Sequence, residues 1–167
     1  FTLTKGLTIG SVDGTVDVNS GTFTVPDNIT LAFKGNTNLN AGTDITTTDG
    51  GKLSFTGTAT IADDAKLKLG ATSVTVIAAD AALNEKTATL NVSTTKFGVL
   101  TKETGNKIEA SGATGTVAEL HFTDSGAAID LAKVGALNGN GGVNDENITH
   151  GANVTLKLSA DAIDFNK

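Results

Sequence analysis

Apolar and polar residues alternate along much of this chain. The segments 23–25 (FTV), 53–55 (LSF) and 67–69 (LKL) each place an apolar residue on either side of a polar one. A period of two is the pattern of a half-buried β-strand, and the many Thr and Val residues also favour strands. Glycine-containing pairs such as Asp13-Gly14 and Thr56-Gly57 punctuate the pattern at the spacing of about 8–12 residues that is typical of turns between short strands.

The large apolar residues also recur at a spacing of 22, in three ladders. The first ladder is Phe1, Phe23, Ile45 and Leu67, with Leu90 one residue late; the second is Phe33, Phe55, Ile77 and Val99, continuing loosely through Phe122, Val143 and Phe165; the third is Leu39, Ile61 and Leu83, drifting to Ile108 and Ile129. Internal periods of this length are typical of stacked repeats.

The pattern predicts an all-β fold, a parallel β-solenoid with coils of about 22 residues, in which position n lies under position n+22. The alternative is an antiparallel β-sandwich or jelly roll of a self-assembling surface subunit, which has similar short strands but no fixed period. Two segments, Asp80–Ala88 and Ser125–Leu137, have spacing that would also suit a helix.

We expect two regions: an N-terminal strand over residues 1–12 and a single β domain over 13–167, with coils clearest over 13–100. The first nine residues alternate and place four apolar side chains at the start of the chain, which are Phe1, Leu3, Leu7 and Ile9. A strand of this kind can add to the sheet edge of a neighbouring subunit, so these four residues are the predicted subunit interface. Alternatively, the strand pairs within its own subunit as a first coil.

The amino-acid composition excludes or disfavours several kinds of site and partner. The 167 residues include no Cys, Met, Trp or Tyr, and no Arg occurs. Disulfides, Cys-ligated metals and cysteine nucleophiles are therefore excluded. A net charge of −6 without Arg disfavours nucleic acid as a partner, and no apolar run is long enough to predict membrane insertion. The start at Phe1 suggests a processed N-terminus or a fragment. The lack of oxidisable residues favours an extracellular or cell-surface location.

No residues combine into convincing catalytic chemistry. His121 and His150 lie far apart in the sequence, and a triad of Ser125, His121 and Asp124 lacks a nucleophile-elbow motif. Sugar-cleaving chemistry would lack aromatic platforms and arginine clamps. We therefore expect no enzyme activity and no cofactor.

Acidic residues cluster at 63–64, 145–146 and 161–164, and the segment 144–147 (NDEN) is the best candidate for calcium. It lacks the alternating spacing of an EF-hand, so solvated surface is the better interpretation.

The stretch 50–58 (GGKLSFTGT) typifies a Thr-, Asn-, Gly- and Ala-rich texture. This texture resembles the β-solenoid repeats of bacterial and archaeal surface proteins, such as autotransporter passengers and filamentous adhesins, over residues 13–100. The resemblance implies an extracellular structural subunit that assembles with copies of itself into a filament, pilus-like fibre or surface coat. The alternative is a ligand-binding adhesin module of a larger cell-surface protein.

Overall fold

The computed structural model describes residues 1–81, 86–103, 105–113, 115–123 and 154–158 of the chain. It is an all-β structure with one short α-helix in these residues. In chain order the elements are β1 (Leu7–Val18), β2 (Gly21–Val25), β3 (Thr30–Leu39), β4 (Thr43–Thr47), β5 (Lys52–Thr56), β6 (Thr58–Ile61), β7 (Lys66–Leu69), β8 (Val74–Ala79), β9 (Thr87–Val92), α1 (Thr94–Leu100), β10 (Lys107–Gly112), β11 (Val117–Phe122) and β12 (Val154–Leu158).

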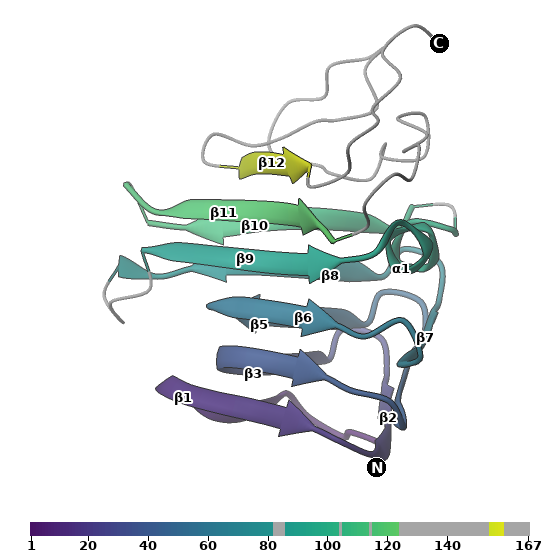
Figure 1. Cartoon of the computed structure of the whole chain (residues 1–167). Coiled ribbons are helices and arrows are strands. Elements are labelled where there is room, and N and C mark those ends of the chain that lie inside the picture. The colour runs from purple at the N-terminus through teal and green to yellow at the C-terminus, as the bar shows by residue number, and fades with distance from the viewer. Residues whose placement is uncertain (82–85, 104, 114, 124–153, 159–167) are drawn as a thin grey trace, which may run out of the picture.

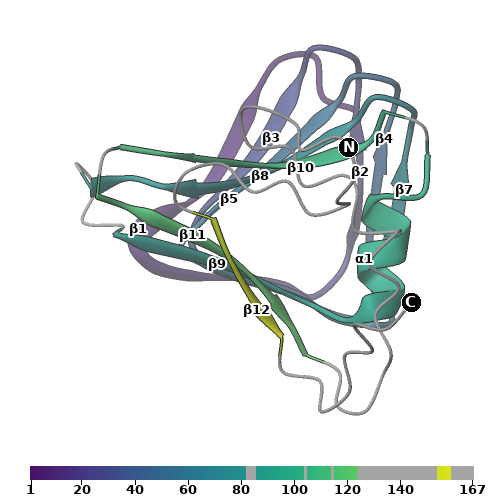
Figure 2. The same ribbon diagram turned by 90° about the horizontal axis from the view of Figure 1, so that it is seen from above.

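The strands form two parallel sheets around one interior (Figure 2). β3 is long enough to bend: its first half pairs with β5 and its second half with β6. The bend falls at Gly35, whose φ of +76° is accessible to glycine at little cost, and Gly57 with φ of +88° repeats it in the strands above. The large sheet thus supplies two faces, β10-β8-β5-β3 and β3-β6-β9-β11-β12, and the small sheet β2-β4-β7 supplies a third.

The register of the strands matches the 22-residue spacing at the start of the ladders. Phe23 pairs with Ile45 and Ile45 with Leu67, while Phe33 pairs with Phe55 and Phe55 with Ile77. Every pair of named strands in the described residues is parallel, which the antiparallel alternative did not predict.

The matched register places like residues above one another in the interior. The rings of Phe33 and Phe55 are stacked with centroids 5.5 Å apart, and both side chains are buried. We call each passage of the chain through the faces a layer, and the layers succeed one another along the stack from β1 upward (Figure 1). The first layer is the chain start before β1 together with β1 and β2, and the third is β5, β6 and β7.

The fourth layer is longer than the period predicts, so the later ladder assignments were wrong. β5 reaches β6 through one residue, whereas seven residues separate Ala79 at the end of β8 from Thr87 at the start of β9. Val99 therefore falls in α1 instead of above Ile77, whose partner is Ala110. Leu90 pairs with Ala59 and Leu120, Phe122 with Val92, and Ile108 with Thr75. Leu83, Ile129, Val143 and Phe165 lie outside the described residues.

The helix α1 continues the third face above β7 (Figure 1). Ser93 caps its start by accepting a hydrogen bond from the backbone N of Lys96 at 3.2 Å, and the Lys96 Nζ donates to the Ala65 carbonyl at 2.5 Å. Phe97 is buried and meets the ring of Phe122 edge-on, with centroids 5.0 Å apart. Of the segment Asp80–Ala88, for which a helix was the alternative, the described residues show a 3-10 turn at Ala81 and the start of β9 at Thr87, and Ser125–Leu137 lies outside the described residues.

Candidate assembly interface

The first residues of the chain pair with its own sheet. Thr2 forms a parallel bridge with Thr24 of β2, where the Leu3 N donates to the Thr24 carbonyl at 3.0 Å and the Thr24 N donates to the Phe1 carbonyl at 2.8 Å. The terminal ammonium donates to the Thr22 carbonyl at 2.6 Å. The ring centroid of Phe1 lies 5.9 Å from that of Phe23, so Phe1 occupies its place in the first ladder.

The strand β1 forms the end of the large sheet. It pairs with β3 along one side, and no strand of the described residues pairs with its other side. Both β1 and the chain terminus lie at the same end of the stack (Figure 1). A parallel strand edge with unpaired N–H and C=O groups is a template for another strand. This end of the molecule therefore offers main-chain hydrogen bonds to a partner.

The four predicted interface residues all lie in this first layer, and their exposure differs. Phe1 is 84% exposed and Leu7 37%, and they are the exposed large hydrophobic residues of the described chain. Leu3 and Ile9 are partly buried against the core. Phe1 and Leu7 are therefore free to contact a partner, whereas Leu3 and Ile9 also hold the layer in place.

The sequence pattern over residues 1–12 predicts only part of the strand at this end of the molecule. The boundary predicted between residues 12 and 13 falls inside β1, which continues to Val18. Val16 is partly buried against the core, and Val18 is buried. The alternation of Val16, Asp17 and Val18 is the sequence signal for this continuation. The uncovered layer thus runs over both faces of the large sheet.

The side of the stack has a different character. On the face formed by β3, β6, β9 and β11 the outward positions form two columns of mostly Thr and Asn. One column is Thr15, Asn36, Thr58, Thr89 and Glu119, and the other is Asp17, Asn38, Thr60, Asn91 and His121.

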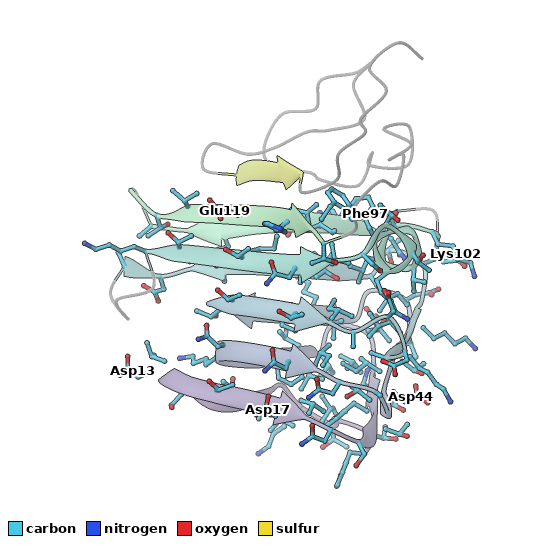
Figure 3. All side chains as sticks on the ribbon, in the orientation of Figure 1. Asp13, Asp17, Asp44, Phe97, Lys102 and Glu119 are labelled. Carbon is cyan, nitrogen blue, oxygen red and sulfur yellow. The ribbon has the colours of Figure 1, made fainter. Side chains whose placement is uncertain are left out.

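Hydrogen bonds within these columns join neighbouring layers. The Asn38 Nδ2 donates to Asp17 Oδ1 at 2.6 Å, and the Asn91 Nδ2 donates to Thr60 Oγ1 at 3.1 Å. Asp17 lies near the lower end of the face and Glu119 near its upper end (Figure 3). Because these polar groups satisfy one another, the side face is less suited to pairing than the open edge of β1.

The described residues among the remaining catalytic and calcium-binding candidates do not come together in a site. His121 is partly exposed and stands beside Asn91 in the register, and Asp63 and Asp64 lie exposed in the turn between β6 and β7. His150, Asp124, Ser125 and the acidic segments 144–147 and 161–164 lie outside the described residues. Within the described part of the chain, no three His, Asp or Glu side chains gather as metal ligands do. The helix found there is too short and too polar to cross a membrane.

No protein-family model matches this sequence, and the searches of curated proteins and of solved structures likewise give no match.

Proposed function

We propose that the chain is a parallel β-solenoid with coils of about 22 residues that serves as a structural subunit and joins to further copies of itself end to end. The support for the solenoid is the register, which repeats at a spacing of 22 through Phe23, Ile45 and Leu67 and through Phe33, Phe55 and Ile77. A stack of this kind has two ends, and each end must be capped or paired.

The single observation that carries the self-assembly is the uncovered first layer. Its edge strand β1 has an unpaired side within the described residues, and the exposed Phe1 and Leu7 stand on the same layer. Covering about 300–400 Å² of apolar surface would contribute on the order of 8–10 kcal/mol before the costs of association. Added main-chain hydrogen bonds would make a joint that survives dilution.

The proposed setting is the extracellular space or the cell surface, with the assembled form a filament, a pilus-like fibre or a coat. The absence of Cys and Met from all 167 residues supports this location, because these are the side chains that oxidation outside the cell would damage. The proposed partner is a second copy of this chain.

The test is assembly measured by sedimentation velocity and negative-stain electron microscopy over a wide range of protein concentration. The parent should form elongated oligomers that grow with concentration. The double variant Phe1→Lys, Leu7→Lys places two charges on the exposed residues of the first layer and leaves Leu3 and Ile9, which pack against the core, unchanged. It should remain a folded monomer.

The matched control is Thr48→Lys, Thr58→Lys, which adds the same charge at exposed positions of higher layers. It should assemble like the parent. A parent that stays monomeric at every concentration would reject the proposal in favour of a binding module such as an adhesin domain. Equal assembly of the Phe1→Lys, Leu7→Lys variant and its control would place the joint elsewhere.

A further inference from the structure

The turn between β2 and β3 contains the motif Asn-x-Thr, formed by Asn28, Ile29 and Thr30. Asn-x-Ser/Thr is the acceptor sequence for N-linked sugars, which are attached at exposed loops of secreted proteins. The motif occurs four times in the chain, and two of these copies, at Asn147 and Asn153, lie outside the described residues. The structure therefore allows two copies to be compared.

The turn leaves the side-chain amide of Asn28 accessible. Asn28 is exposed, and its φ of +59° lies in the left-handed region that asparagine tolerates better than most residues. The register of β2 with β4 and of β3 with β5 places Gly50 at the same position of the next layer, so no side chain stands there above the amide. The Asn28 Nδ2 donates to the Asp27 Oδ2 at 2.9 Å, and this hydrogen bond lies on the surface.

The second described copy of the motif, formed by Asn91, Val92 and Ser93, is built into the fold. Asn91 lies within β9, and its Nδ2 donates to the Thr60 Oγ1 at 3.1 Å. Ser93 is 4% exposed, and its Oγ accepts the hydrogen bond from the Lys96 backbone N that caps α1. Both polar side chains of this motif are therefore held in hydrogen bonds of the folded protein, and the serine is covered.

We propose that Asn28 is a modification site at which the folded protein receives an N-linked sugar. The donor is a sugar whose anomeric carbon carries a phosphate leaving group, as in a nucleotide-linked sugar or a lipid-linked oligosaccharide. A bond forms between that carbon and the Asn28 Nδ2, while the bond from the carbon to the phosphate oxygen breaks. The phosphate leaves with the electron pair, and one amide proton passes to a base of the transferase. The other amide proton stays on Nδ2 and can still be donated to Asp27.

The test treats the folded protein with N-glycosyltransferases in two reactions, one with a nucleotide-linked sugar and one with a lipid-linked oligosaccharide. Mass spectrometry of tryptic peptides measures the two motifs separately, because cleavage after lysine places Asn28 in residues 6–34 and Asn91 in residues 87–96. In at least one reaction the occupancy of Asn28 should exceed that of Asn91 by about tenfold or more, because the second motif can react only when β9 opens. The donor that reacts identifies the source of the sugar. In a tryptic digest treated in the same way the difference should disappear.

Three variants separate the motif from the fold. Asn28→Gly suits the left-handed backbone and removes the acceptor nitrogen, whereas Thr30→Val keeps Asn28 and the strand but removes the hydroxyl of the motif. Both should lose the sugar on residues 6–34, and the control Thr30→Ser should retain it.

Three outcomes would overturn the proposal: an unmodified Asn28 in both reactions of the parent, equal occupancy of Asn28 and Asn91 in the folded protein, or an undiminished sugar in Thr30→Val. The inference goes beyond the proposed end-to-end assembly and does not require it. Sedimentation tests the assembly separately, so either idea can fail while the other stands.

Discussion

Side chains in the interior of this molecule lie above one another, because the register of the strands repeats. Phe55 lies between Phe33 below it and Ile77 above it, and it is 1% exposed. A charged side chain at this position would therefore have no contact with water. The same register places Thr58, three residues later, on the exposed side of the next strand.

Phe55→Asp should therefore unfold the protein, because an unpaired carboxylate in the core costs several kcal/mol against a total stability of about 5–15 kcal/mol. Thr58→Asp is the control and should melt like the parent. Circular dichroism during thermal unfolding measures both. If Phe55→Asp retained the melting temperature of the parent, the stacked ladder would not be the core.

Alanine substitutions at two glycines should change the stability of the protein in opposite directions. Gly57 has φ of +88°, and a Cβ there would lie 2.9 Å from the Gly35 carbonyl carbon, so Gly57→Ala should destabilise the protein by about 1–3 kcal/mol. Gly98 lies in α1 with nothing within 4 Å of a Cβ, so Gly98→Ala should stabilise it by up to about 1 kcal/mol. Denaturant unfolding would show the two shifts, and equal shifts would contradict the corner geometry.

Among the elements of the described residues, α1 is a helix at a position where the repeat would place a strand. It stands where the next strand after β7 would continue the third face, and its residues Phe97 and Leu100 take over the filling of the interior. A seven-residue helix is too short to be stable by itself, so its position depends on the cap and on this burial.

Ser93→Ala should accordingly lower the free energy of unfolding by about 1 kcal/mol, because the Lys96 backbone N loses its side-chain acceptor at the start of the helix. Thr95→Ala is the control at an exposed position of the same helix, where alanine has the better helix propensity. Urea unfolding of the two variants should separate them. A Ser93→Ala protein as stable as the Thr95→Ala protein would show that the cap contributes nothing.

At the scale of the whole molecule, the uncovered first layer should make the melting temperature depend on the protein concentration. If copies cover this layer in the assembled state, the melting temperature should rise with protein concentration, since association that requires the folded state stabilises it. The Phe1→Lys, Leu7→Lys variant should melt at one temperature over the same range. Differential scanning calorimetry at several concentrations measures this. A parent melting temperature independent of concentration would contradict the linkage.

The sequence by itself determined the β character and most of the early register. Both follow from local alternation and from a constant number of residues per layer, so Phe33, Phe55 and Ile77 could be aligned by counting. It also determined that the apolar residues Phe1, Leu3, Leu7 and Ile9 begin the chain.

The tertiary structure decided the rest, because a period fails wherever a layer changes length. The segment between β8 and β9 and the helix α1 lengthen the fourth layer, so Leu90, Val99 and Phe122 take partners that counting does not give. The first layer is lengthened in the same way, because Ser11–Gly14 stand where β3 has Gly35 alone. The exposure of Phe1 and Leu7, and the burial of Ile9 beside them, depend on which neighbours the chain brings to that end, and no local pattern contains that information.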